Sequence, residues 1–207
     1  MNKYNLKGTF NLNSSLLGLS GQLDRNDKVV RHNKINPYDV KRIYAEHEVA
    51  AHTLTHPNLT TLDNDTIKWQ VEQDRKTLGS LVGYKIKCMA YTGGGVNNDD
   101  RVAEIIKRET KIKCARTATS TYSFDIQENL YRFNPSIYYI EVNKLFEMGK
   151  EFINLKTEEP KLFYIWGHSY EMDAGYIQWE DFEKFCKLIS NKDDIFYGTN
   201  SEIFFGR

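Results

Sequence analysis

The sequence predicts an α/β fold in which helices cover a parallel β-sheet. Short apolar runs rich in strand-forming residues alternate along the chain with longer segments whose apolar residues recur at helical spacing. Parallel neighbours need crossover connections, and helices are the usual ones. The pattern does not distinguish an open sheet from a barrel. The 207 residues fit a single domain, residues 1–207.

Strands and helices alternate through the first half of the chain. Strands are predicted over residues 6–13 and 48–51, and a helix over 37–45 opens with a proline after a capping asparagine. A second helix is capped by Asp63 and carries Ile67, Val71, Leu78 and Leu81 on one face. Each of these strands is thus followed by a helix.

The second half continues the alternation. Strands are predicted over 84–91, 112–116, 162–166 and 195–197, and helices from the caps Asn98 and Asn143 and over 179–189. Residues 117–135 are polar and irregular, which is long for a connection in a compact domain. This segment is therefore a candidate functional loop.

Composition excludes several classes of partner. Lysine plus arginine equals aspartate plus glutamate, 28 each, so no overall charge favours nucleic acid or an anionic membrane. The first residues contain no apolar leader, so we expect a cytoplasmic protein. The three cysteines, Cys88, Cys114 and Cys186, form no CxxC pair. This spacing indicates free buried thiols, with neither a disulfide framework nor a zinc knuckle.

Polar or flexible residues follow the predicted strands at their carboxyl ends. They are His52, His56, Gly93 to Gly95, Arg116 and His168. In parallel α/β folds the carboxyl ends of the strands meet at one edge, and ligands bind there. We therefore expect these residues to lie on one rim.

His52 and His56 are four residues apart, a spacing that lets two imidazoles bind one metal ion. A helix is excluded, because Pro57 disfavours the α conformation at the residue before it and no glutamate follows His52 as in a helical HExxH site. A metal pair on a loop is the specific alternative. Two ordinary surface histidines beside a turn are the other.

The segment from His47 to Leu59, HEVAAHTLTHPNL, closely resembles the second motif of the polysaccharide deacetylases, the NodB-homology domains of carbohydrate esterase family 4. In that family both histidines of HTxxHP bind a divalent cation, usually zinc. The resemblance implies this role for His52 and His56. Lys7 to Asn13 is similar to the second strand of the family, so the likeness extends through most of the chain.

Ile165 to His168 is similar to the late LxxH motif, which implies that His168 is the general acid that protonates the leaving group. A histidine that merely ends a core strand is the alternative. Arg116 is placed like the arginine that orients the catalytic carboxylate, although a surface arginine fits equally well.

Residues 90–95, AYTGGG, occupy the place of the third motif but lack its arginine and proline. Tyr91 is the nearest match to the tyrosine whose backbone N–H stabilises the oxyanion. Gly93 and Gly94 allow further backbone amides to approach it. A flexible turn without this role is the alternative.

The first motif of the family, TFDD, has no counterpart in this chain. In the family it supplies an aspartate as general base and a second one as metal ligand. The resemblance therefore implies a distorted (β/α) barrel that lacks its first strand, with zinc bound weakly and little turnover. Glu171 and Asp173 either substitute in part for the missing aspartates, or line the groove or order the His168 loop. An opened barrel exposes strand edges, so we expect a homodimer or marginal solubility.

The resemblance implies a metal-dependent hydrolase that removes N- or O-acetyl groups from a carbohydrate. The expected partner is an acetylated carbohydrate, with no nucleic acid and no membrane. Two alternatives stay open. One is a non-catalytic carbohydrate-binding pseudoenzyme, and the other is a related C–N hydrolase acting on a small cyclic amide.

Overall fold

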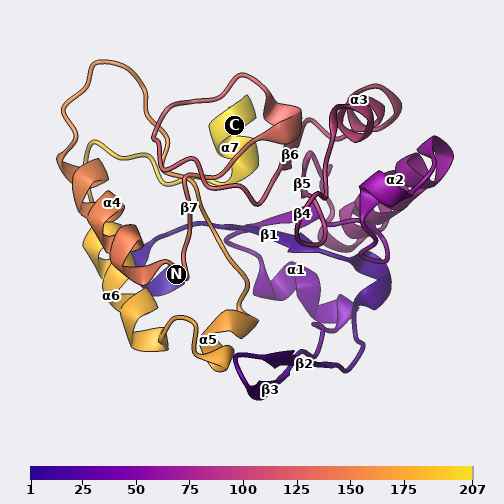
Figure 1. The fold of residues 1–207 in the computed structure, drawn as a ribbon, viewed down its shortest axis with the longest axis horizontal. Helices are drawn as coiled ribbons and strands as arrows, with labels where there is room; N and C mark the ends of the chain where they lie inside the picture. Colours follow the sequence, from indigo (N-terminus) through magenta and orange to yellow (C-terminus); the bar gives the residue numbers. More distant parts are fainter. Residues whose placement is uncertain (207) are drawn as a thin grey trace.

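The computed structural model describes residues 1–206. A parallel sheet of four strands forms its centre (Figure 1), in the order β1 (Thr9–Leu12), β4 (Glu48–Ala51), β5 (Cys88–Ala90) and β6 (Cys114–Arg116). The predicted α/β fold with a parallel sheet is therefore confirmed. All four strands run in one direction, so the loops that follow them leave the sheet at the same edge.

Three helices, α1 (Val40–Ile43), α2 (Asn64–Val82) and α3 (Asp100–Glu109), pack against the sheet. β4 is buried on both faces. Val49 and Ala51 belong to the core under these helices, and Ala50 packs on the other face beside Cys88 and Cys114. The strand reads as a continuous apolar run because neither face meets solvent.

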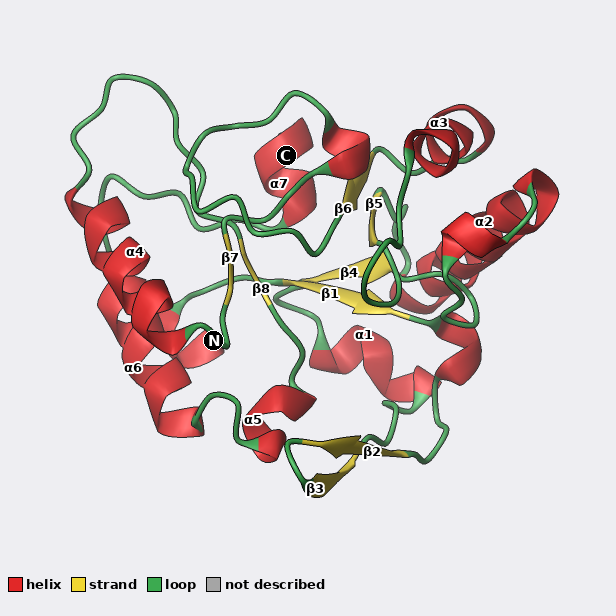
Figure 2. Cartoon of the chain, in the orientation of Figure 1, coloured by secondary structure: helices red, strands yellow, loops and turns green. Residues whose placement is uncertain are grey.

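The C-terminal half forms a second layer of structure (Figure 2). β7 (Ile137–Tyr138) and β8 (Ile165–Trp166) pair in parallel, and α4 (Val142–Asn154), α5 (Tyr170–Ala174) and α6 (Trp179–Ile189) lie beside them. Their core contains Leu145, Met148 and Phe185. Within residues 1–206, no helix is long and apolar enough to span a membrane.

The predicted distorted barrel is not confirmed. A single bridge between Arg116 and Phe133 continues β6 toward β7, and no ladder joins β8 to β1 in the described chain. The irregular segment 117–135 separates the two sheets, with only the short 3₁₀ turn Leu130–Arg132. The strands are only two to four residues long, and the irregular segment lies between the two sheets. The sheet therefore stays open.

Several predicted boundaries are corrected by local hydrogen bonds. Asp99, and not Asn98, caps α3, because its side chain accepts the Val102 N–H. Glu141, not Asn143, precedes α4. Residues 195–197 form no strand. The Tyr197 hydroxyl bonds back to the end of α6, and helix α7 (Asn200–Phe205) follows.

A hairpin that the sequence analysis did not predict lies between β1 and α1. β2 (Gln22–Arg25) and β3 (Lys28–Arg31) pair in antiparallel fashion around Asn26 and Asp27. Both turn residues have positive φ, 52° and 58°. Asparagine and aspartate tolerate this conformation, which two-residue hairpin turns require. The Asn-Asp pair between alternating residues was the available signal.

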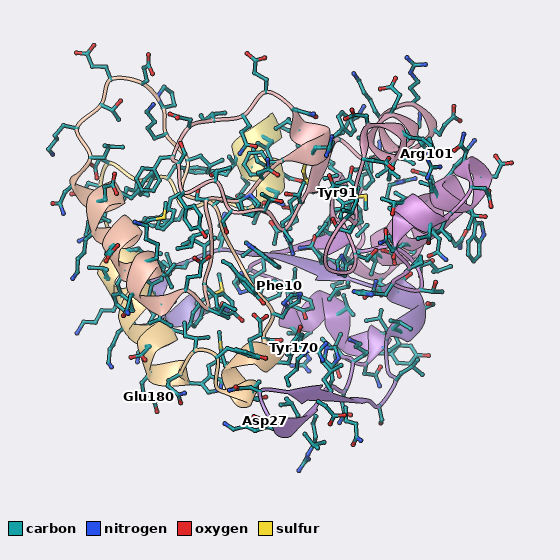
Figure 3. All side chains as sticks on the ribbon, in the orientation of Figure 1. Phe10, Asp27, Tyr91, Arg101, Tyr170 and Glu180 are labelled. Atoms are coloured by element: carbon teal, nitrogen blue, oxygen red, sulfur yellow. A yellow bond between two sulfur atoms is a disulfide. The ribbon has the colours of Figure 1, made fainter. Side chains whose placement is uncertain are left out.

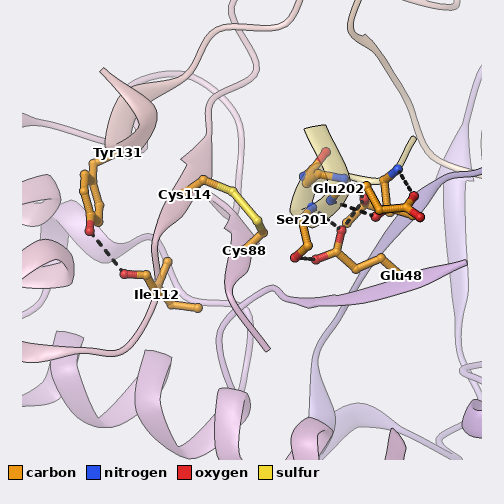
Figure 4. Close-up of a disulfide and its surroundings, with 10 residues drawn as sticks. Glu48, Cys88, Ile112, Cys114, Tyr131, Ser201 and Glu202 are labelled. Atoms are coloured by element: carbon orange, nitrogen blue, oxygen red, sulfur yellow. Dashed lines mark hydrogen bonds between the residues drawn. A yellow bond between two sulfur atoms is a disulfide. The ribbon is translucent and has the colours of Figure 1, made fainter. Parts of the chain in front are cut away.

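Cys88 and Cys114 form a disulfide (Figure 4), so the expectation of three free thiols is wrong for this pair. The two residues are direct register partners on β5 and β6, with Cα atoms 4.7 Å apart. Their separation of 26 residues gives no sign of this proximity. Cys186 is free and buried, as expected.

A second contact shown in Figure 4 attaches the C-terminal helix to the sheet. The buried Glu48 carboxylate accepts the Ser201 N–H at 2.9 Å and the Ser201 hydroxyl at 2.6 Å. Thr9 on β1 donates to the same carboxylate at 3.0 Å. Phe204 and Phe205 then pack on the face of the sheet that holds the disulfide.

Candidate active site

His52 follows β4 directly and is held through both its backbone and its ring. Its N–H donates to Asp74 of α2 at 2.9 Å, and its Nδ1 lies 2.8 Å from the carbonyl oxygen of Ala90. A carbonyl only accepts, so Nδ1 carries the proton and the Nε2 lone pair is free. Burial and the neighbouring charge of His56 lower the pKa of His52 to about 3. The ring is therefore neutral at physiological pH.

His56 lies beside it, with ring centroids 4.9 Å apart and the rings edge to face. Burial lowers the pKa of His56 as well. The loop that brings the rings together is tight, with φ of 63° at Thr53 and 65° at His56. Two neutral imidazoles at this distance are suitable metal donors.

Side chains from outside the loop fix its shape. Asn13, just after β1, donates to the carbonyl of Thr53 at 2.9 Å. Gln70 of α2 accepts the Thr55 N–H at 3.0 Å and donates to the Thr55 hydroxyl at 2.8 Å. These buried amides satisfy the polar groups of a loop that belongs to no regular element.

His168 follows β8 and pairs with Glu171. Its Nδ1 lies 2.9 Å from Glu171 Oε1, and its N–H donates to Glu171 Oε2 at 2.8 Å. Its ring stacks on Tyr170 with centroids 5.0 Å apart. Burial, reinforced by Arg116, lowers the pKa of His168 to about 4, and burial raises the pKa of Glu171 to about 7. The His168 ring is therefore neutral at physiological pH, and Glu171 is the member of the pair that titrates near neutrality.

Glu171 thus orders the His168 loop, as one of the two sequence interpretations proposed. Asp173 lies apart from this contact and accepts the indole N–H of Trp179 at 3.2 Å.

Arg116 ends β6 and is buried between the histidines. Its guanidinium lies 4.7 Å from the Trp166 ring and donates to the Thr117 carbonyl at 3.1 Å. Its charge lowers the pKa of both His52 and His168, which places it near both rings. It makes no ion pair with any carboxylate in residues 1–206. Glu171 is near enough to raise the pKa of Arg116 but forms no ion pair with it. Burying a charge that is not directly paired is costly, so an anionic group bound here would be favoured.

The geometry does not support the oxyanion role expected for Tyr91. Its N–H donates to the Arg116 carbonyl at 3.0 Å, and its hydroxyl donates to the Tyr131 carbonyl at 2.6 Å. The side chain is buried in the core under α2 and α3. Both donors are therefore already used.

Gly93 and Gly94 lie in an exposed loop beside the histidine loop. Thr92 donates to the Pro57 carbonyl, which joins the two loops. Gly93 has φ of 84°, and no atom lies within 4 Å of the position that a Cβ would take at either glycine. Open space on this loop leaves room for a ligand to approach its backbone.

Two further residues of the site escaped the sequence analysis because they belong to the unpredicted hairpin. The His32 ring packs against Tyr170, with centroids 5.1 Å apart. Lys34 Nζ lies 2.9 Å from His32 Nε2. In the sequence these two residues are marked only by their place at alternate positions, on either side of Asn33.

The residues present supply part of a metal site. His52 has the arrangement of a metal ligand, because one ring nitrogen is fixed by a carbonyl while the other is free. No group of three His, Cys, Asp or Glu side chains able to hold a metal ion occurs in the described chain. Zinc usually takes at least three protein ligands. The two histidines therefore fit zinc as an incomplete donor set.

The chain is similar to solved structures of two deacetylases and of a pseudoenzyme. It aligns with the Streptococcus pyogenes deacetylase PplD in complex with acetate at 18% identity and a TM-score of 0.51, over 64% of this chain and 53% of that one. The Bc1960 peptidoglycan N-acetylglucosamine deacetylase aligns at 16% identity and 0.52, over 98% and 77%. A mutant of BA3943, a CE4 family pseudoenzyme, aligns at 16% identity and 0.51, over 90% and 54%.

At these identities the likeness concerns the fold. The chain spans about half the length of the first and third of these proteins. A comparison with curated protein sequences gives no match. The family model for polysaccharide deacetylases, however, matches residues 1–109, more than half of the 207 residues. This chain therefore belongs to the polysaccharide deacetylase family, the NodB-homology domains of carbohydrate esterase family 4.

Proposed function

We propose that this protein removes N- or O-acetyl groups from a carbohydrate with the help of a divalent cation, most suitably zinc. The convergence of His52, His56, Arg116 and His168 at the carboxyl ends of the parallel strands carries the proposal. His52 and His56 would hold the cation. When bound, it supplies Lewis-acid polarisation of the acetyl carbonyl and a lowered pKa for water.

The other side chains have separate roles in this proposal. His168 protonates the departing amine or alcohol through Nε2, while Glu171 holds Nδ1 and stabilises the imidazolium. Arg116 supplies a buried positive charge for a carboxylate that the described residues do not provide. The N–H groups of Gly93 and Gly94, on the open loop, are the candidate donors to the acyl oxygen.

Aromatic side chains beside His168 suit the binding of a sugar. Tyr138 and Trp166 stack with ring centroids 4.1 Å apart, and Tyr170 stacks on His168. Sugar rings pack their apolar faces on such surfaces, while aromatic hydroxyl and indole groups bond their edges. The buried Trp166 Nε1 has no hydrogen-bond partner in residues 1–206, and a sugar hydroxyl would satisfy it.

One observation favours a second candidate function, a non-catalytic carbohydrate-binding protein. Residues 1–206 contain no group of three side chains able to hold a metal ion. The carboxylate beside the histidine pair, Asp74, already accepts the N–H groups of His52 and Ser14. A protein that kept the aromatic surface and lost the base would bind the glycan without hydrolysing it.

Acetate release from an N-acetylglucosamine oligomer, measured with zinc added, tests the proposal. We expect release by the wild type, a loss of about 10²-fold or more in His168→Asn, and little change in His47→Asn. His47 is the matched control, because its ring contacts Phe10 and the Gly8 N–H outside the site. Oligomer binding without acetate release in the wild type would support the non-catalytic alternative. Neither binding nor release would contradict both.

A further inference from the structure

The hairpin continues into a longer ribbon over residues 18–35, and its two faces differ. Beyond β2 and β3 the ladder is extended by the His32 N–H to the Gly21 carbonyl and the Lys34 N–H to the Leu19 carbonyl, both at 2.8 Å. Val30 is 5% exposed and Val29 is 68% exposed. Alternate residues therefore face the body of the protein.

The inner face of the ribbon is basic. It carries the buried Val30 and the half-buried His32 and Lys34 at alternate positions. Toward the turn, Lys28 and its register partner Arg25 continue this face and are exposed. Arg31 and Asn33 occupy the outer face and are exposed. The net charge of the whole chain is zero, so this concentration is a local feature.

The inner face is docked against the loop that carries the candidate general acid. Asn26 donates to the Ala174 carbonyl at the end of α5 at 3.0 Å. The His32 ring lies edge-on to Tyr170, which stacks on His168. Figure 1 shows the hairpin beneath α5, and Figure 3 shows Tyr170 between Phe10 and the hairpin turn at Asp27.

The basic groups form no ion pairs in residues 1–206, although Arg25 is near enough to Glu171 to lower the pKa of that carboxyl. Lys34 is half-buried and bonds to the His32 ring, and it forms no ion pair in residues 1–206. Arg25 bonds only to the carbonyl of its neighbour Asp24, at 2.8 Å. The charges reach the site, since Arg25 lowers the pKa of His168 and Lys34 lowers the pKa of His56.

We propose that Lys34, His32 and Arg25 form a subsite for an anionic substituent, a carboxylate or a phosphate, on the carbohydrate whose acetyl group lies at His56 and His168. This inference rests on the proposed function and narrows its substrate to acidic glycans. A half-buried ammonium is favoured when an anion replaces its lost hydration. Charge-assisted hydrogen bonds to carboxylate or phosphate oxygens are among the strongest available.

The test compares the binding of two oligomers of equal length by calorimetry, which requires no turnover. One is a neutral N-acetylglucosamine oligomer, and in the other alternate sugars carry a carboxylate on an ether side chain. We expect the acidic oligomer to bind about tenfold more tightly at low salt, with a preference that shrinks as salt is added. Inorganic phosphate and acetate, added as competitors at constant ionic strength, distinguish phosphate from carboxylate as the better-fitting anion.

Variants locate the effect on the ribbon. Arg25→Gln combined with Lys34→Gln should remove the preference for the acidic oligomer and leave the binding of the neutral one within about twofold. Arg31→Gln removes one positive charge from the outer face of the same ribbon, and Lys34→Gln alone is the variant matched to it in charge. The Arg31→Gln control should keep the preference.

The outcomes separate the two proposals. Equal binding of the two oligomers by the wild type, or a preference that survives the double substitution, would overturn the acidic subsite, whatever the deacetylase activity. A preference that is lost in the double variant would support it even if no acetate were released, and would then fit the non-catalytic carbohydrate-binding protein. Circular dichroism of the double variant confirms that the fold is intact.

Discussion

The Nδ1 atom of His168 lies 2.9 Å from Glu171 Oε1, and the same carboxylate accepts the His168 N–H through its other oxygen. This two-point contact fixes both the backbone and the ring of the candidate general acid. Because Nδ1 is engaged, Nε2 is the nitrogen left for a leaving group. The contact also links the protonation of the ring to that of a buried carboxyl.

Replacing Glu171 by glutamine tests that link. Glutamine retains an oxygen for the His168 N–H but removes the charge that stabilises an imidazolium, so we expect kcat to fall about 10- to 100-fold with KM little changed. Burial raises the pKa of Glu171 to about 7, so the wild-type rate should decline as the pair loses its proton above that pH. The variant should show a shifted alkaline limb. An unchanged pH profile would mean that the contact is only structural.

Zinc binding provides a second prediction. With two neutral imidazoles and no third described ligand, we expect weak zinc binding near pH 7, and His52→Ala should abolish it. Because the pKa values of both rings are lowered, protons compete with zinc for the ring nitrogens only at lower pH. The zinc affinity should therefore fall at a lower pH than for an exposed histidine pair. Calorimetry from about pH 7 to 5 measures this. His47→Asn is the control, and tight binding that survives His52→Ala would place the metal elsewhere.

Local signals predicted much of the fold. The strand Glu48–Ala51 and the helix Trp179–Ile189 match their predicted bounds, and Asp63 caps α2 as expected. Apolar runs and capping residues act over a few positions, so they are visible in one sequence. The closure of a barrel depends on distant pairings. The expectation of a distorted barrel that lacks only its first strand therefore did not foresee the break between β6 and β7, or the absence of a ladder between β8 and β1 in the described chain.

The site was predictable in its histidines and not in their surroundings. The two histidines of HTxxHP are recognisable because their spacing lies within one short motif. The side chains that position this loop come from elements before and after it in the chain: Asn13, Gln70 and Asp74. The link from Lys34 through His32 to Tyr170 joins segments more than a hundred residues apart. Contacts of this kind depend on how helices and strands pack against one another. The spacing of residues along the sequence does not reveal that packing.

The disulfide predicts a specific pattern of thiol reactivity. In denaturant without reductant, an alkylating reagent should modify one cysteine, Cys186, and reduction should expose Cys88 and Cys114 as well. Mass spectrometry of the peptides measures this. Closing a loop of 26 residues stabilises a fold by about 3 kcal/mol in the chain-entropy account, so Cys88→Ala combined with Cys114→Ala should lower the unfolding free energy by that order. Alkylation of all three residues before reduction would contradict the pairing.

The buried His52 should make stability depend on pH. Its pKa is about 3 in the folded protein and has the ordinary histidine value of 6.5 in the unfolded chain, so between these values the unfolded chain binds one more proton. Stability from this residue is therefore complete above pH 6.5 and is lost as pH falls toward 3. From pH 7 to 5 the loss amounts to about 2 kcal/mol.

His52→Asn isolates that contribution, because asparagine can donate to the Ala90 carbonyl and does not titrate. Urea unfolding with a chelator present, at about pH 7 and pH 5, gives the free energies. Burial raises the pKa of Asp74 to about 6, which works in the opposite direction, but Asp74 is present in both proteins. The comparison between them therefore reports mainly on His52. We expect the wild type to lose about 2 kcal/mol more than the variant on acidification, and equal losses would show that His52 is not buried as a neutral ring.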